Sequence, residues 1–203
     1  MSIDLLRILG HRLSRLNWSD FSKQVMWAAC VTSFFTSCRM GELLAPQEKK
    51  FDSSTTLLWS NVKFSDKKEV LMLIPYSKTT GFKGKLLDIF PLKDKSLCPV
   101  SALSRLKNLS INHGIFSENM PVFMFKSGKF LTKATLNSWL AVILGDFTDK
   151  MHRITGHSFR SAIPTALSTH PNTDSAIIIK EWGGWVSSCY TRYTKAEREK
   201  RKI

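Results

Sequence analysis

The sequence predicts an α+β fold that is mostly α-helical and carries one small three-stranded antiparallel sheet. Apolar residues recur with a helical period of roughly 3.6 residues over the first 38 residues and again from Pro99 onward. Between these regions, residues 56–91 hold short apolar runs separated by turn-forming segments, which is typical of strands. The chain shows no internal repeat, no low-complexity segment and no linker long enough to divide it. We therefore expect a single domain over residues 1–203.

Two helices are predicted at the N-terminal end. Residues 4–17 place leucine and isoleucine side chains at near-helical spacing with basic residues between them, which predicts an amphipathic helix. Ser19 and Asp20 then offer an N-cap for a second helix. This second helix, residues 22–38, is apolar almost all round, so we expect it to be buried.

The sheet and the later helices follow in order. The turn-rich segments SDKK and SKTTGFKGK separate three runs that read as strands, at 56–64, 69–76 and 85–92. The helical period then returns in three segments, at 99–109, 132–147 (with a threonine cap) and 157–168. A further helix-like segment precedes Gly183 and Gly184, which break it.

Composition and charge limit the classes of partner that the protein could bind. The 13 phenylalanines and 6 tryptophans exclude a disordered chain. No apolar run is long enough for a membrane span and no signal peptide opens the sequence, so we expect a soluble, unexported protein without a membrane partner. With 30 basic against 16 acidic residues the formal net charge is +14, which points to a polyanion, usually nucleic acid.

The cysteines give no sign of a metal site. Cys30, Cys38, Cys98 and Cys189 stand far apart, without a CxxC spacing or paired histidines nearby. A structural zinc site is therefore not expected. We interpret the four as free thiols in a reducing compartment.

An arginine stands at the C-terminal end of the predicted buried helix, in the segment CRMGELL. Burying Arg39 without an anionic partner would be expensive, and Glu42 follows three residues later, close enough on one helical face to pair with it. One interpretation is a structural Arg–Glu pair at a helix end. The other is an arginine fork that binds phosphate.

Three lysines gather at the turn between the second and third predicted strands. Lys78 lies in SKTTG, and Lys83 and Lys85 follow it. Lysines on a hairpin are usually solvated loop charges. Three at one tip can instead reach into DNA, where one can donate a proton to a leaving oxygen.

A histidine and an arginine share one helical face in the segment GHSFR. His157 and Arg160 are three residues apart at the start of a predicted helix. A proton-transfer group and a bidentate cation at a helix N-terminus suit phosphoryl transfer. The alternative is a capping histidine beside a surface arginine.

Aromatic residues near the C-terminal end form the fourth feature. Trp185 follows two glycines, and Tyr190 and Tyr193 come next. A tyrosine with basic neighbours can act as a covalent nucleophile, because their positive charges stabilise its phenolate. Tyr193 has Arg192 and Lys195 as basic neighbours, a poor setting for a core aromatic, whereas Tyr190 is the better core candidate.

The order of these features is more specific than any one of them. Read as CRMGELL, SKTTG, GHSFR, GGW and YTRYTK, the five segments resemble the catalytic domain of the tyrosine recombinases, the phage integrase family. The GGW…RY ending is most similar to the recombinases of eukaryotic DIRS-type retrotransposons and Crypton elements. Type IB topoisomerases use related chemistry, so topoisomerase-like activity stays an alternative.

The resemblance implies the roles of the residues that touch the reacting phosphate. Tyr193 would attack a DNA phosphate and form a 3′-phosphotyrosyl link with a free 5′-hydroxyl. Arg39 and Arg160 would clamp the non-bridging oxygens and stabilise the transition state. His157 would take or return a proton, and Trp185 would donate its indole N–H to a phosphate oxygen.

The resemblance also implies a general acid and supporting contacts. Lys78 would protonate the leaving 5′-oxygen, although Lys83 or Lys85 could reach the same place. Glu42 would orient Arg39. Double-stranded DNA is the implied partner, with contacts to it expected from Lys83, Lys85, Arg192 and Lys195.

The implied chemistry is site-specific recombination or transposon integration, with cleavage and rejoining of DNA strands. It needs no metal, because two arginines, a lysine and a histidine supply the positive charge. It needs no ATP, because the phosphotyrosine conserves the ester bond energy. We expect an oligomer on DNA, dimer or tetramer, and the nucleus as the compartment. The N-terminal core-binding domain of the family is expected to be absent from residues 1–203, since only 38 residues precede Arg39.

Two other functions remain open from the sequence. One is a non-catalytic DNA-binding domain, domesticated from such an enzyme. The other is a basic protein-binding or RNA-binding module in which the five segments coincide by chance. That last hypothesis predicts that Arg39, His157, Arg160 and Tyr193 do not converge in space.

Overall fold

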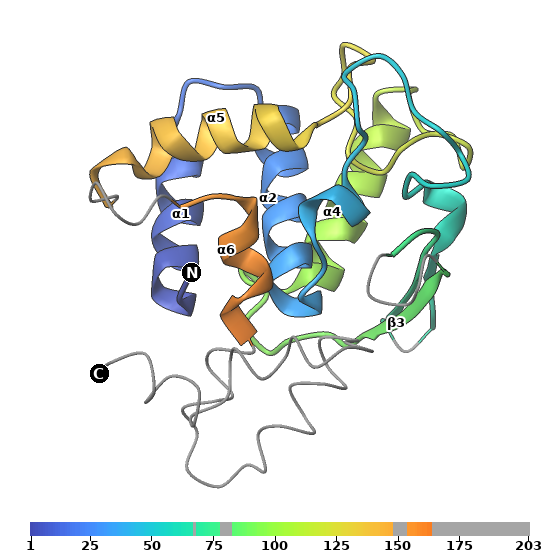
Figure 1. Cartoon of the computed structure of the whole chain (residues 1–203), viewed down its shortest axis with the longest axis horizontal. Helices are drawn as coiled ribbons and strands as arrows, with labels where there is room; N and C mark the ends of the chain where they lie inside the picture. The colour runs from blue at the N-terminus through green and yellow to red at the C-terminus, as the bar shows by residue number, and fades with distance from the viewer. Residues whose placement is uncertain (67, 78–82, 148–153, 164–203) are drawn as a thin grey trace, which may run out of the picture.

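The computed structural model describes residues 1–66, 68–77, 83–147 and 154–163. Within them a helical body carries a three-stranded antiparallel sheet at one side, so the predicted α+β class is confirmed. Figure 1 shows α2 in the middle of the body, with α1 on one side and α4 on the other. None of the helices in these ranges is long and apolar enough to cross a membrane.

The two predicted N-terminal helices are present. Helix α1 (Ile3–Arg15) buries Leu6, Leu9 and Leu13 on one face, as its amphipathic pattern predicts. Helix α2 (Asp20–Thr36) begins at Ser19, whose Oγ accepts a 3.2 Å hydrogen bond from the backbone N–H of Ser22.

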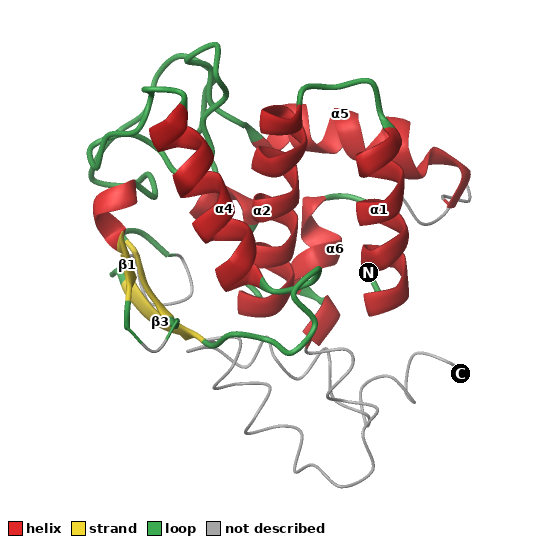
Figure 2. Ribbon diagram, turned by 180° about the vertical axis from the view of Figure 1, so that it is seen from behind, coloured by secondary structure: helices red, strands yellow, loops and turns green. Residues whose placement is uncertain are grey.

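Helix α2 is the centre of the core. It packs against α1, α4 (Pro99–Asn112) and the short α6 (Gly156–Arg160). The side chain of Gln24 is buried and donates a 2.8 Å hydrogen bond to the carbonyl of Ala102 in α4. The view from behind in Figure 2 shows the same neighbours around α2. An almost wholly apolar helix therefore lies where every face is covered.

The end of α2 differs from the prediction. The helix stops at Thr36, because Ser37 adopts a left-handed conformation with φ 53°. A separate short helix, α3 (Met40–Leu43), begins after Arg39, which has extended backbone. Arg39 and Glu42 are thus not on the last turn of the buried helix; Arg39 is the cap residue of a new helix and Glu42 is its third residue.

The sheet contains β1 (Val62–Phe64), β2 (Val70–Ile74) and β3 (Lys85–Ile89), paired antiparallel in that order. One face turns its apolar side chains into the core: Val62, Val70, Met72, Ile74 and Ile89. The first strand is shorter than predicted. Residues 56–61 run instead through a bridge between Leu58 and Pro121 and the 3₁₀ turn η1 (Trp59–Asn61).

Helix α5 (Lys133–Leu144) begins at the predicted threonine cap. Thr132 Oγ1 accepts a 3.1 Å hydrogen bond from the backbone N–H of Thr135. The 3₁₀ turn η3 (Gly145–Phe147) extends the helix, and Arg12 ties this end to α1 with a 3.0 Å hydrogen bond to the carbonyl of Ile143.

Candidate active site

Arg39 and Glu42 hold each other at the start of α3. Glu42 Oε2 accepts a 2.8 Å hydrogen bond from the backbone N–H of Arg39, and Glu42 Oε1 lies 3.2 Å from Nη1 of the same arginine. The carboxylate is buried, whereas the Arg39 side chain is 40% exposed. The predicted pair is confirmed as a contact, and it leaves part of the guanidinium facing solvent.

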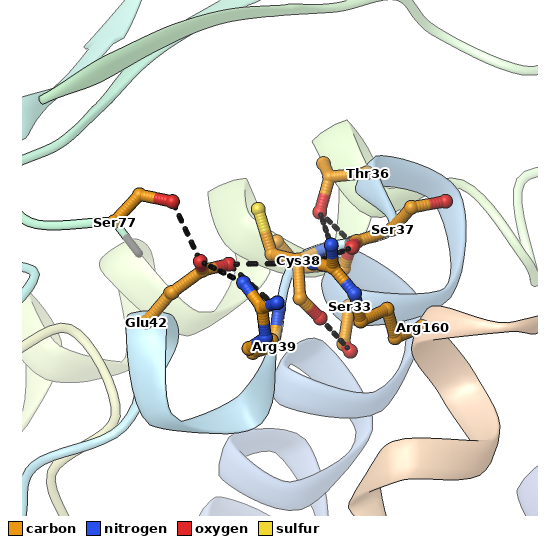
Figure 3. A network of polar contacts seen from close by, with 9 residues as sticks. Ser33, Thr36, Ser37, Cys38, Arg39, Glu42, Ser77 and Arg160 are labelled. Atoms are coloured by element: carbon orange, nitrogen blue, oxygen red, sulfur yellow. Dashed lines mark hydrogen bonds and ion pairs between the residues drawn. The ribbon is translucent and has the colours of Figure 1, made fainter. Parts of the chain in front are cut away.

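Arg160 reaches the same carboxylate from α6. Its side chain is 3% exposed, and Nη1 lies 3.8 Å from Glu42 Oε2. Nη1 also donates a 3.0 Å hydrogen bond to the carbonyl of Ser37, the residue that ends α2. The alternative of a surface arginine is therefore wrong for Arg160. Figure 3 shows the Arg160 guanidinium beside Ser37 and the Arg39 guanidinium beside Glu42.

A third element reaches Glu42 from the sheet. Ser77 follows β2, is fully buried, and donates a 2.7 Å hydrogen bond to Glu42 Oε1. One buried carboxylate thus joins α3, α6 and the β2 end of the hairpin. The Ser77 contact could not be predicted from the sequence, because a serine before a turn is ordinary turn chemistry.

His157 lies at the rim of this network. It is an exposed residue near the N-terminal end of α6, which begins after the cap residue Thr155. Partial burial lowers the pKa of its imidazole, and the positive charges of Arg160, Arg39 and Lys133 lower it further. The ring is therefore neutral near pH 7 and able to accept a proton.

The cationic side chains line a pocket of about 330 Å³. Its walls include Arg39, Glu42, His157 and Arg160, so three of the four residues tested by the chance hypothesis converge here. Lys133, the first residue of α5, also lines it. Sequence reasoning missed Lys133, whose only signal was its place directly after a predicted helix cap.

Of the three lysines predicted at the hairpin, Lys85 lies near the network of Arg39, Glu42 and Arg160. Burial lowers the pKa of its ammonium group, while the Cys38 thiol and Glu42 raise it and Arg160 and Arg39 lower it. The half-buried first residue of β3 is therefore within electrostatic range of the arginine–glutamate network. Lys83 is exposed.

Cys38 lies inside the same network and is 1% exposed. Burial raises the pKa of its thiol to about 11. The thiol therefore stays protonated at neutral pH and acts as a small packing group. The other described cysteines, Cys30 and Cys98, are also free and buried.

The remaining predicted site residues lie outside the described residues. They are Lys78, Trp185, Arg192, Tyr193 and Lys195. Their roles stay predictions that rest on the sequence segments.

The described residues have the chemistry that suits an oxyanion. Two guanidinium groups and a neutral imidazole border one pocket, and the only carboxylate among its described walls already holds both arginines. Guanidinium groups suit a phosphate because their planar N–H donors match its oxygens. The imidazole adds a proton acceptor beside it.

Comparison with known proteins supports the fold. No protein-family model matches the sequence, and no curated protein matches it. Among solved structures, the chain is similar to the XerH site-specific recombinase bound to difH substrate in a pre-cleavage complex, with a TM-score of 0.65 and 15% identity. It is also similar to XerH bound to palindromic difH substrate in a post-cleavage complex, with a TM-score of 0.63 and 16% identity.

Both alignments cover 100% of this chain and 51% of the XerH chain, so the sequence spans about half the length of these neighbours. At such low identity the similarity concerns the fold. A helical body with a three-stranded antiparallel sheet, matched over its whole length, has the fold of the tyrosine recombinases.

Proposed function

We propose that this chain is the catalytic part of a DNA recombinase that cleaves and rejoins strands through a phosphotyrosine. The observation that carries the proposal is the convergence of Arg39, Arg160 and His157 on one pocket from two separate helices. The resemblance to the tyrosine recombinases requires this convergence, because in that family these residues act on one phosphate. It also argues against the hypothesis that the motifs coincide by chance.

The reaction transfers one phosphoryl group. The hydroxyl oxygen of Tyr193 attacks a DNA phosphorus and forms a P–O bond, while the bond from phosphorus to the leaving 5′-oxygen breaks. The tyrosine proton passes to neutral His157, and a lysine gives a proton to the 5′-oxygen. A 5′-hydroxyl of the partner strand then attacks the 3′-phosphotyrosine and gives its proton to the now neutral lysine. The bond from phosphorus to the tyrosine oxygen breaks, His157 returns the proton to that oxygen, and a phosphodiester is restored.

The two arginines would stabilise charge on the non-bridging oxygens. Arg160 is fixed by Ser37 and Glu42, so its position costs no reorganisation when the phosphate arrives. Arg39 is partly exposed and is held from one side by Glu42, which leaves donors for the substrate. Preorganised donors of this kind are a large part of phosphoryl-transfer catalysis.

Lys85 is an alternative to Lys78 as the general acid. Its lowered pKa makes it a stronger acid than an exposed lysine, and the charges of Arg160 and Arg39 contribute to that lowering. The motif SKTTG favours Lys78 by resemblance. Replacing each lysine in turn would show which of the two protonates the leaving oxygen.

Double-stranded DNA is the proposed substrate. The formal net charge of +14 supports a polyanionic partner, and the XerH neighbours are complexes with difH substrate. The GGW…RY ending supports a finer proposal, a mobile-element enzyme acting on DNA in the nucleus as a dimer or tetramer.

The test is a covalent trapping experiment. The chain is incubated with nicked duplexes whose cleaved end diffuses away, in EDTA, and a denaturing gel is used to look for a protein–DNA adduct. We expect an adduct that disappears in Tyr193→Phe. An adduct that persists in this variant would move the nucleophile to Tyr190.

A second readout separates catalysis from binding alone. Tyr193→Phe should bind duplex DNA as well as the unchanged chain, with the same dependence on salt. If the unchanged chain binds DNA but forms no adduct on any duplex, the non-catalytic alternative replaces the proposal.

A further inference from the structure

The arginine pocket continues into a second hollow. This hollow has a volume of about 720 Å³, and it shares Gly41, Tyr76 and Lys133 with the arginine pocket. The two spaces therefore adjoin, and we call them together the α3–α5 groove. It runs from His157 and Arg160 past the start of α3 to the first turn of α5.

The walls of the second hollow suit a sugar–phosphate chain. Its described lining contains no carboxylate. Short apolar and hydroxyl or amide side chains make up much of it, including Ala45, Pro46, Thr55, Thr132 and Asn137. Apolar walls with a few polar groups can pack a deoxyribose and donate or accept hydrogen bonds at its oxygens.

Lys133 is the cation at the junction of the two hollows. It lines both of them, it is exposed, and its charge contributes to the lowered pKa of His157. No carboxylate among the described residues lies within ion-pair distance of its ammonium group. Its positive charge is therefore available to a ligand that already occupies the arginine pocket.

Gly41 forms an open part of the same junction. It is exposed, and a Cβ built on it would meet no atom within 4 Å. The backbone of α3 is thus accessible from the groove. A larger side chain at this position would project into open space without disturbing the packing.

From this geometry we propose that the α3–α5 groove binds the DNA strand next to the scissile phosphate, and that Lys133 contacts a neighbouring phosphate. The inference rests on the proposed function and adds to it the path of the strand. Lys133 is then a positioning residue: it sets which phosphate enters the arginine pocket and takes no part in proton transfer.

The test compares the salt dependence of DNA binding in three variants of the full chain. Fluorescence anisotropy with a labelled duplex gives the slope of log K against log salt for the unchanged chain, Lys133→Gln and Gly41→Leu. Lys95→Gln is the matched control, because Lys95 is exposed and lines a different hollow beside α4.

We expect Lys133→Gln to reduce the slope by about 0.9, the contribution of one phosphate, which corresponds to about eightfold weaker binding at 0.1 M salt. Lys95→Gln should leave the slope unchanged. Gly41→Leu should weaken binding about tenfold without changing the thermal midpoint, since the new side chain would occupy the part of the groove that the DNA strand needs. Adduct formation by Lys133→Gln should recover at saturating DNA.

Distinct outcomes identify which proposal fails. If the unchanged chain binds and forms an adduct while Lys133→Gln keeps its slope, or Gly41→Leu binds normally, the groove does not carry the strand and only this inference is overturned. If the unchanged chain shows neither salt-sensitive binding nor an adduct, the proposed function fails and takes the inference with it.

Discussion

The hydroxyl of Ser77 donates a 2.7 Å hydrogen bond to Glu42 Oε1, across 35 residues of sequence. Both side chains are buried. This bond fixes the base of the β2–β3 hairpin to the carboxylate that also holds Arg39 and Arg160. The end of β2 is therefore positioned relative to both arginines by one shared residue.

Glu42→Gln should destabilise the fold. The change removes the only buried negative charge described beside the two arginines and breaks the 3.8 Å ion pair between Glu42 and buried Arg160. Removing one partner of a buried pair costs about 3 kcal/mol. We expect the free energy of unfolding in urea to fall by this amount, with little change in its dependence on urea concentration.

Glu48→Gln is the control for that measurement. Glu48 pairs with Lys129 at the surface, 3.2 Å from its Nζ, and solvent screens the contact. Its urea midpoint should match that of the unchanged chain. Equal midpoints for Glu42→Gln and Glu48→Gln would show that Glu42 does not hold the arginines in place.

Arg39→Lys should slow catalysis without unfolding the protein. The side chain is partly exposed, so a lysine fits, but a single ammonium group cannot replace two parallel N–H donors. We expect the rate of adduct formation to fall about 100-fold at saturating DNA. A thermal midpoint close to that of the unchanged chain should accompany the loss. A rate within a few-fold of normal would remove Arg39 from the transition state.

Local signals made most helices predictable. Ser19 and Thr132 are cap residues whose side chains accept from the first turn, so the starts of α2 and α5 follow from sequence. The end of α2 did not follow, because Ser37 takes a positive φ that glycine usually supplies. The tertiary contact from Arg160 to the Ser37 carbonyl accompanies this turn.

The candidate site was predictable only in part. The spacing of Arg39 to Glu42 and of His157 to Arg160 is local, so each pair could be recognised in the sequence. That Glu42 serves both arginines and Ser77 is a long-range fact. Lys133 was missed for the same reason, since only packing brings the start of α5 beside His157.

Lys85→Gln tests which lysine is the general acid. If Lys85 protonates the leaving 5′-oxygen, the variant should form adduct about 100-fold more slowly on ordinary DNA. A substrate with sulfur in place of that oxygen should restore the rate, because a thiolate leaves without protonation. The matched variants are Lys78→Gln and Lys83→Gln. Rescue by sulfur in Lys78→Gln, with no defect in Lys85→Gln, would assign the role to Lys78.

The pH dependence of adduct formation tests His157. Burial and the charges of Arg160, Arg39 and Lys133 hold its pKa below the ordinary 6.5, so the imidazole is neutral above that pH. If it accepts the tyrosine proton, the rate at low DNA concentration is flat near pH 7. Below the lowered pKa the rate should fall by about tenfold per pH unit.

His157→Gln should lower the plateau and remove this fall. A second readout follows from the same shift: between the lowered pKa and 6.5 the unfolded chain binds more protons than the folded one, so folding stability falls as pH drops through that window. The variant should lose this part of the pH dependence of unfolding. If the rate of His157→Gln keeps the wild-type pH profile, the proton acceptor is another group. If only the pH dependence of unfolding changes, His157 affects stability and takes no part in proton transfer.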